Sequence, residues 1–277
     1  MNLKKTLYRL LIYLILTILA AATIVPFVIM FLGAFREHTD IILRGPLALP
    51  QIWDLKNFKT AILDFNFDLY TLNTLIITAP TVLISLFFAT MASYALSFMK
   101  MVFQKTFTLL TTVVGVMIAA EFIMIPLYHL LNTMGLVNTY WAAIFPQVAM
   151  STAFATLIIR SFFQGLPKEL VDSGLVDGAS SWQILWHILV PLAKPAIITS
   201  GALTTVWTWN SYIIPLVMLP DQNKAPLPLG LVLFQGEHTA NIPLTMAGTT
   251  ITALPMLIFY FFFQRHIIKG LSQGAVD

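Results

Sequence analysis

Long runs without a charged residue are the feature of this 277-residue sequence that most restricts its fold. About 20 residues at a rise of about 1.5 Å each cross a hydrocarbon core about 30 Å thick. The uncharged runs cover residues 10–35, 69–99, 106–120, 130–159, 195–220 and 239–264, and the third continues to 128 past the single acid Glu121. The sequence therefore predicts an all-α polytopic membrane protein with six transmembrane helices, at about 10–35, 71–98, 106–128, 140–160, 195–219 and 242–264.

Composition supports a helical membrane protein and excludes several alternatives. Hydrophobic residues make up 58% of the chain and charged residues 10%, against about 45–50% and about 25% in globular domains. The runs are continuously apolar, whereas barrel strands alternate every second residue. With no cysteine, there is no disulfide framework, thiol nucleophile or thiolate metal site. The first run exceeds the about 7 to 15 apolar residues of a signal peptide, so we interpret it as a retained span.

Basic residues predict the orientation. Ten of the 15 lie at the N-terminus, in the second and fourth connections and in the C-terminal tail, and five lie in the first and fifth connections. Because Lys and Arg accumulate in short cytoplasmic segments, both termini are expected in the cytoplasm. The outer loop 36–68 and the inner loop 161–194 are then the two large segments outside the bilayer, and neither is long enough for a domain with its own core.

The inner loop carries clear helix signals. Pro167 to Leu170 predicts a helix start, since proline is tolerated in the first turn, and Asp177-Gly178 predicts its end. Ser180 or Ser181 is expected to cap a second helix that runs into the fifth span. An amphipathic helix must bury its apolar stripe, and lipid headgroups are one possible cover. That stripe consists of Leu170, Val171, Gly174 and Leu175.

The same loop resembles a known signature. Asp177-Gly178-Ala179 and Pro191-Leu192-x-x-Pro195 stand at the separation found in the coupling loop of permease subunits of bacterial ABC importers, and Asp172-Ser173-Gly174 takes the place of that family's Glu-Ala-Ala. Nearly the whole chain is similar to the maltose-type sugar permeases. Further matching segments are Ile125 to Tyr128, Met134 to Thr139, Phe162-Phe163, Trp209-Asn210 and the tail from Gln264 to Val276.

The resemblance implies a single ABC-importer transmembrane domain over residues 1–277, in the bacterial cytoplasmic membrane. Its expected partners are a second, distinct permease subunit, two ATP-binding subunits and an extracytoplasmic substrate-binding protein, with a carbohydrate as substrate. ATP and Mg would be bound by the partner subunits, so this chain is expected to be neither an enzyme nor a cofactor-binding protein, and no nucleic acid is expected as a partner. ATPase-coupling residues carried over by the resemblance are Glu169, Asp172, Ser173, Gly174, Asp177, Gly178, Ala179 and Ser180.

The fifth span and one acid are candidates for the substrate path. A sugar offers hydroxyls to an amide and an apolar ring face to an aromatic side chain, and packing against the partner permease is an alternative role for the same residues. These fifth-span candidates are Thr204, Trp207, Asn210 and Ser211. Glu121 is the only acid within a span, and intramembrane carboxylates are functional candidates by default. We place it towards the outer end of the third span, with a gate, docking or local hydrogen-bonding role.

No group of His, Asp and Glu has metal-ligand spacing, and no glycine-rich phosphate loop ending in Gly-Lys-Ser/Thr is present. A membrane enzyme and a nucleotide-hydrolysing unit are therefore disfavoured. Two alternatives stay open: an importer for another solute, such as a glycerol phosphodiester or a polyamine, and an ion-coupled secondary transporter. The sequence does not name the sugar or the partner permease, and it does not distinguish a Gram-negative from a Gram-positive source.

Overall fold

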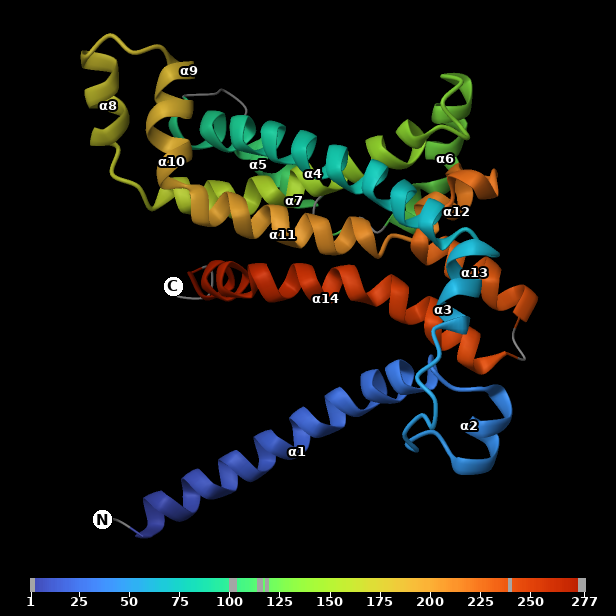
Figure 1. Ribbon diagram of the computed structural model, residues 1–277. Helices are drawn as coiled ribbons and strands as arrows, with labels where there is room; N and C mark the ends of the chain where they lie inside the picture. Colours follow the sequence, from blue (N-terminus) through green and yellow to red (C-terminus); the bar gives the residue numbers. More distant parts are fainter. Residues whose placement is uncertain (1–2, 100–103, 114–116, 118–119, 239–240, 274–277) are drawn as a thin grey trace. The chain divides into compact units, whose positions relative to one another are not determined.

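The computed structural model describes residues 3–99, 104–113, 117, 120–238 and 241–273, and these residues form helices (Figure 1). Four of the helices are long and apolar enough to cross a membrane, and a bent pair makes a fifth candidate. The four are α1 (Leu3–Gly33), α4 (Phe67–Phe98), α7 (Tyr140–Gln164) and α14 (Ile242–Gln273). The bent pair joins residues 181–192 to α11 (Lys194–Trp209). The chain is thus an all-α polytopic membrane protein.

The third expected span corresponds to two helices, α5 (Gln104–Thr112) and α6 (Ala120–Thr133). Part of the segment between them lies outside the described residues. The fifth expected span, 195–219, is interrupted in the structure, because α11 ends at Trp209 and α12 (Ile213–Met218) follows. Asn210 donates its side-chain amide to the carbonyl of Val206, at 2.7 Å. In a continuous helix Pro215 would lack an amide to donate to the carbonyl of Ser211 and its ring would clash with that carbonyl, so both side chains oppose a continuous helix.

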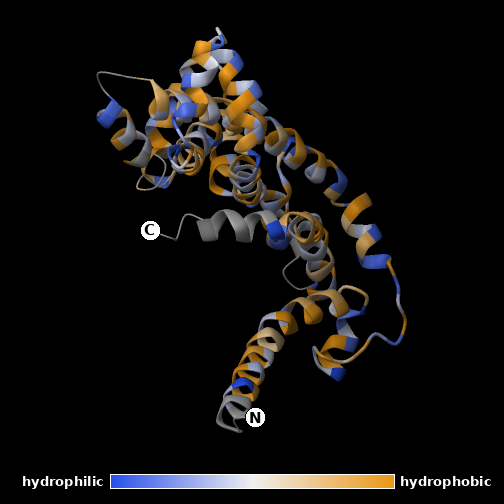
Figure 2. Cartoon of the chain, turned by 90° about the vertical axis from the view of Figure 1, so that its left-hand side faces the viewer, coloured by the Kyte–Doolittle hydropathy of each residue, from blue (hydrophilic) through white to orange (hydrophobic). Residues whose placement is uncertain are grey.

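The chain divides into two compact units. Unit 1 comprises residues 1–68 and 231–254, and unit 2 comprises residues 69–230 and 255–277. Unit 1 contains α1, α2 (His38–Arg44) and α3 (Lys56–Leu63). It shares two helices with unit 2, namely α13 (Leu227–His238), of which it holds residues 231–238, and α14, of which it holds residues 242–254. The apolar stretch of α1 has none of its residues buried within the chain, and Figure 2 colours most of this helix as hydrophobic.

One buried arginine organises the loop after α1. Arg36 is 3% exposed, and its Nε donates to Asp40 Oδ2 at 2.6 Å while its Nη1 donates to the carbonyl of Gly45 at 2.7 Å. The Arg36 hydrogen bond lowers the pKa of the Asp40 carboxyl below its ordinary value. Asn57 of α3 adds hydrogen bonds from its amide to the carbonyls of Ala34 and Arg36. These contacts give a loop with little hydrophobic core of its own a defined conformation.

Unit 2 is built on α4, α7 and α11, which pack through small and hydroxylated residues. Ser93 of α4 donates to the carbonyl of Thr156 on α7 at 3.0 Å, and both residues are buried. A Cβ atom on Gly201 of α11 would lie 3.0 Å from Leu86 of α4, so the glycine permits close contact between these two helices. Small residues commonly allow such close helix packing in membranes.

One end of unit 2 holds α8 (Glu169–Val176), α9 (Ser181–Gln183), a π-helical segment η2 (Ile184–Leu189) and α10 (Val190–Leu192) (Figure 1). The chain bends by 80° between residues 181–192 and α11. The sequence predicts that the second helix of the loop runs into the fifth span. In the structure the bend separates this helix from α11. Prolines at 191 and 195 flank the bend and remove two backbone donors there.

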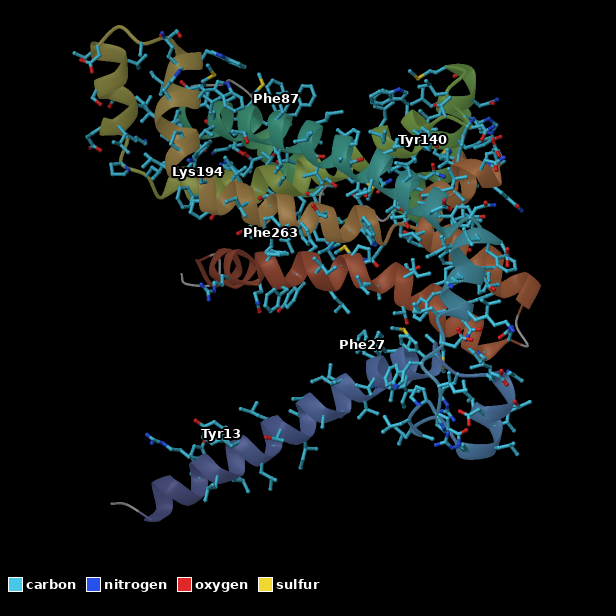
Figure 3. All side chains as sticks on the ribbon, viewed as in Figure 1. Tyr13, Phe27, Phe87, Tyr140, Lys194 and Phe263 are labelled. Carbon is cyan, nitrogen blue, oxygen red and sulfur yellow. The ribbon has the colours of Figure 1, made fainter. Side chains whose placement is uncertain are left out.

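At the opposite end of unit 2, a buried asparagine makes hydrogen bonds to two other segments of the chain. Asn73 of α4 has no exposed surface. Its amide donates to the carbonyls of Asn223, in the short helix η3 (Gln222–Lys224), and Ala225, at 2.8 and 3.0 Å. Its oxygen accepts from the hydroxyl of Tyr140 at 2.7 Å. Figure 3 labels Tyr140 at this end of unit 2. One side chain, Asn73, thus joins α4, the start of α7 and the loop before α13.

We predict that Asn73→Ala destabilises the folded chain, because it leaves the buried carbonyl of Ala225, the carbonyl of Asn223 and the hydroxyl of Tyr140 without this partner, at about 1–3 kcal/mol for a buried unsatisfied group. Tyr140→Phe is the matched control, since it removes only one of the three hydrogen bonds. Thermal unfolding of the purified protein in detergent measures both variants. Equal midpoints for Asn73→Ala and Tyr140→Phe would show that the asparagine does not hold this end together.

Candidate functional site

The inner-loop helix lies where the sequence predicts it. α8 covers Glu169–Val176 and follows Pro167, and Gly178 adopts a φ of +79°, a conformation that glycine tolerates without strain. The amide of Gly178 donates to the carbonyl of Leu175 at 3.1 Å, and that of Ala179 donates to Gly174 at 2.9 Å. This arrangement ends the helix and satisfies carbonyls of its last turn.

Of the two candidate serine caps, Ser180 is the one used. Its hydroxyl accepts from the amide of Gln183, whose side chain in turn accepts from the Ser180 amide at 2.8 Å. This reciprocal pair satisfies donors at the start of a helix. Ser180 therefore has a local structural role that accounts for a serine at this position.

One face of α8 packs against its own chain. Val171 and Gly174 are buried, and a Cβ atom on Gly174 would lie 3.1 Å from Ile184 and 3.2 Å from Ile188 of η2. Gly174 thus lets α8 approach η2. Ala179 also packs against the hydrophobic cluster that contains Ile184. The sequence analysis attributed these small residues to a partner contact, and the structure gives both an intramolecular one.

The other face of α8 is exposed and combines acids with apolar side chains. Leu175, placed on the buried stripe by the sequence analysis, is 53% exposed, and Val176 is 87% exposed. The exposed candidate coupling residues beside them are Glu169, Asp172, Ser173, Asp177 and Gly178. An exposed apolar pair rimmed by carboxylates fits a partner surface that offers a hydrophobic cleft with cationic side chains. We call this face the α8 surface.

Aromatic side chains connect the inner loop to α4. Phe87 stacks on Trp186 with ring centroids 5.9 Å apart, and Trp182 lies 5.4 Å from Trp186. Figure 3 labels Phe87 at this end of α4. Trp182 is 53% exposed, as expected for tryptophans that gather at membrane interfaces. The cluster couples the position of residues 182–186 to that of α4.

The structure separates the fifth-span candidates. Thr204 is 1% exposed, whereas Trp207 is 46% exposed. Trp207 packs edge-to-face on Phe154 of α7, with centroids 4.5 Å apart. Asn210 is exposed at the end of α11 and Ser211 is partly exposed beside it. Trp207 and Asn210 can therefore meet a substrate or a partner at the surface of unit 2, and Thr204 is buried within it.

Glu121 lies near the described start of α6, and α6 continues to Thr133, so twelve residues, or about 18 Å of helix, separate Glu121 from the end of α6. Its side chain is exposed, and no described cation lies within ion-pairing distance. The carboxylate can therefore meet another molecule at the surface of unit 2.

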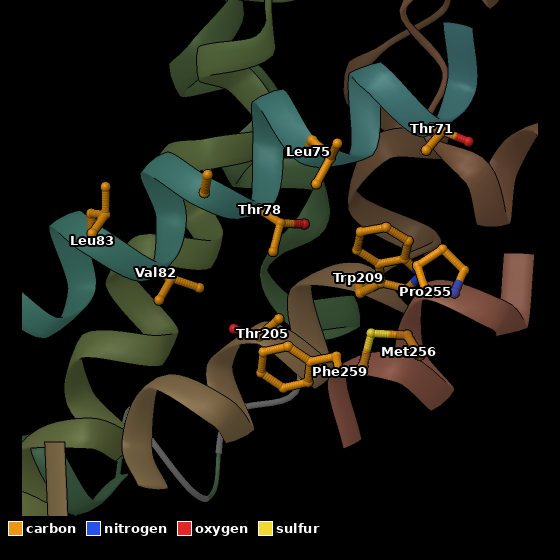
Figure 4. Close-up of a pocket in the computed structure, with 11 residues that line it drawn as sticks. Thr71, Leu75, Thr78, Val82, Leu83, Thr205, Trp209, Pro255, Met256 and Phe259 are labelled. Carbon is orange, nitrogen blue, oxygen red and sulfur yellow. The ribbon is translucent and has the colours of Figure 1, made fainter. Parts of the chain in front are cut away.

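The sequence analysis missed a pocket in unit 2, formed by α4, α11 and the part of α14 that starts at Pro255 (Figure 4). Its volume is about 500 Å³. Trp209 lines the pocket and Trp207 does not. Two residues along an α-helix turn the side chain by about 200°, so helical phase along the fifth span could have separated the two tryptophans. The other lining residues are Thr71, Leu75, Thr78, Ala79, Val82, Leu83, Thr205, Pro255, Met256 and Phe259.

Among the described residues, no three His, Asp or Glu side chains lie close enough together to hold a metal ion. The acids of the α8 surface lie on one exposed helix face.

Comparison with known proteins identifies the family. The family model described as the binding-protein-dependent transport system inner membrane component matches residues 1–273. A probable ABC transporter permease protein of Bacillus subtilis is 32% identical over 252 residues, covering 91% of this chain and 83% of that protein. A probable permease of the starch degradation products transport system of Thermoanaerobacterium thermosulfurigenes is 32% identical, covering 94% of this chain and 93% of that protein.

A solved structure agrees in fold. A chain of a bacterial ABC transporter involved in the import of the acidic polysaccharide alginate superposes with a TM-score of 0.79 at 22% sequence identity, covering 96% of this chain and 98% of that chain. The length of the family match and the identities of the relatives lead to one conclusion. This chain belongs to the family of binding-protein-dependent transport system inner membrane components.

Proposed function

We propose that this chain is the permease subunit of an ATP-driven importer for a sugar or oligosaccharide. The observation that carries the proposal is the family match over residues 1–273 together with curated relatives that are sugar permeases, including one for arabinooligosaccharides that is 31% identical over 93% of this chain. A second permease, two ATP-binding subunits and an extracytoplasmic binding protein complete the importer. Substrate selection rests mainly with the binding protein.

In this proposal the chain crosses the cytoplasmic membrane six times, with both termini inside. α5 and α6 together form the third span, and α11 with α12 forms the fifth. The excess of Lys and Arg at the termini and in the second and fourth connections supports this orientation. α8 then lies in the cytoplasm, where an ATPase can reach it.

The α8 surface is the proposed coupling contact. Leu175 and Val176 enter a cleft of the ATPase subunit, and Asp172 pairs with a cationic side chain at its edge. Gly174, Ala179 and Ser180 act indirectly, because they fix α8 on η2 and start the following helix. Closure of the ATPase pair on ATP moves α8, and the rigid packing against η2 passes that movement to α11 and, through Phe87, to α4.

Trp207, Asn210 and Glu121 are the proposed contacts with the substrate path or with the partner permease that shares it. Trp207 offers a ring face that suits the apolar face of a sugar. Asn210 and Glu121 offer hydrogen-bonding groups that suit sugar hydroxyls. Ser211 lies beside Asn210 and is a weaker candidate, and the buried Thr204 supports the position of α11.

Co-purification with uptake tests the proposal as a whole. We predict that a tagged chain brings down an ATPase and a second permease, and that sugar uptake into liposomes requires all subunits, the binding protein and ATP. Uptake by this chain alone, driven by an ion gradient, would instead identify a secondary transporter. A solute screen on the binding protein names the sugar, and tight binding of only a polyamine or a glycerol phosphodiester would contradict a carbohydrate substrate.

We predict that Gly178→Asp abolishes transport by uncoupling the ATPase. The substitution adds a side chain and a charge at a φ of +79° on the exposed α8 surface. Gly135→Asp is the matched control, because Gly135 has a φ of +68° and equally open surroundings but lies between α6 and α7, at the other end of α7. Uptake and ATPase activity of the purified complexes are measured. Normal uptake by an intact Gly178→Asp complex would refute the coupling assignment.

We predict that Glu121→Gln lowers the rate of uptake about tenfold, which corresponds to about 1.4 kcal/mol of lost stabilisation. The amide keeps the shape of the side chain and removes its charge, so loss of activity would reflect electrostatics. Asp64→Asn, at the C-terminal cap of α3 in the outer loop, is a control for loss of one acid outside the spans. Unchanged uptake and unchanged stimulation by the binding protein in Glu121→Gln would exclude a gating role.

A further inference from the structure

The pocket between α4, α11 and the second half of α14 has no part in the transport mechanism derived above. It holds about 500 Å³ and its surface is almost entirely apolar. The aromatic rings of Trp209 and Phe259 and the sulfur of Met256 form one side, and aliphatic residues of α4 form the other (Figure 4). Pockets of this volume are typical of sites for small organic molecules.

The lining does not suit a sugar. A sugar would bury several hydroxyls here, and each needs a hydrogen-bond partner to offset its desolvation. Thr205 already donates its hydroxyl to the carbonyl of Gly201 at 2.8 Å. The remaining wall contributed by Leu75, Val82 and Leu83 has no polar side-chain atom. The substrate path and this pocket are therefore chemically different sites.

One buried hydroxyl in the lining lacks a partner. Thr78 is 5% exposed, and its Oγ1 has no hydrogen-bond partner. The neighbouring Thr74 and Thr81 each donate to the carbonyl four residues earlier, at 2.8 Å. Figure 4 shows Thr78 extending from α4 towards the side of the pocket that contains Trp209 and Thr205. The ligand that fits is therefore long and apolar, with a single acceptor to meet this hydroxyl.

The length of the pocket matches one leaflet of a bilayer. Its lining on α4 extends from Thr71 to Leu83, which is twelve residues or about 18 Å along the helix. Half of a hydrocarbon core about 30 Å thick is about 15 Å. Leu75 and Leu83 line the pocket and are 49% and 69% exposed, so they form a rim that opens onto the apolar surface of the span. A rim on the apolar surface of a span is accessible to the acyl chains of surrounding lipids.

We propose that this pocket binds one acyl chain of a bilayer phospholipid. The chain enters past Leu75 and Leu83 and lies against Trp209 and Phe259. An ester carbonyl of the lipid accepts the hydrogen bond of Thr78. The proposal depends on the spans alone, so failure of the sugar-import proposal leaves it intact, and the assay below does not use transport.

Photolabelling of the intact complex in nanodiscs tests the site. The probe is a phosphatidylglycerol with a diazirine in the middle of one acyl chain, and labelled peptides are mapped after irradiation. We expect the label on residues 71–83 and 205–209 to exceed that on α1, whose apolar stretch is uniformly exposed. Equal labelling of the pocket residues and of α1 would overturn the proposal. So would labelling of the pocket by a free diazirine fatty acid and not by the phospholipid.

Two variants sharpen the result. Ala79→Phe adds a ring to the pocket lining and should lower the label there about tenfold, whereas Ala21→Phe, the same change on the exposed α1, should not. Leu83→Trp places a larger side chain at the entrance of the pocket. Because Leu83 is exposed, this variant tests entry of the acyl chain without disturbing the core of unit 2. Undiminished labelling in folded Ala79→Phe and Leu83→Trp complexes would contradict the site.

The alternative to a lipid at this pocket is a surface of the partner permease. Because the chain has no native cysteine, Leu83→Cys gives a single reactive site at the rim. We expect it to react with a lipid-soluble maleimide in the assembled complex. Disulfide formation between this cysteine and cysteines placed on the second permease, with no maleimide reaction, would show that protein covers the pocket and would overturn the proposal.

Discussion

Backbone hydrogen bonding in an apolar medium is the constraint on which the rest of the structure depends. In lipid each peptide group must be satisfied within the protein, so an apolar run becomes a helix and any break requires a substitute partner. At the bend before α11, the amide of Ala193 still donates to Leu189 at 2.8 Å. At the end of α11, the carbonyl of Val206 accepts from both the backbone amide and the side-chain amide of Asn210. Hydroxyls of Thr74, Thr81 and Ser85 likewise bond to the preceding turn.

The short helix α8 in the inner loop has one face buried against its own chain and one face exposed. Gly174 and Val171 face η2, and Leu175 with the acids faces outward. An eight-residue helix is marginal on its own in water, so its orientation depends on the packing of its buried side. The close approach at Gly174 therefore fixes the orientation of the α8 surface. In the proposed importer, this contact inside the chain would set the position of the contact with the ATPase.

Local patterns in the sequence were enough to predict the positions of the long helices and the ends of the short helices in the inner loop. Charge-free runs located the long helices, and Pro167, Gly178 and Ser180 located the ends of the short ones. The sequence could not predict the 80° bend at Ala193, because hydropathy records that a segment is apolar and says nothing of its direction. The sequence placed Gly174 on the buried stripe of α8, but it could not name the partners there, since Ile184 and Ile188 are brought to Gly174 only by folding. The split between the buried Thr204 and the exposed Trp207 depends on the position of α7, which no pattern within the fifth span encodes.

The isolation of α1 has a consequence for biosynthesis. No residue of its apolar stretch is buried within the chain, and it leaves the ribosome before α4, α7 and α14 have been made. Its partition into the membrane is consequently decided by its own side chains and the surrounding lipid, residue by residue, without help from helix association. Insertion of this segment and folding of the later helices are separate events in the life of the chain.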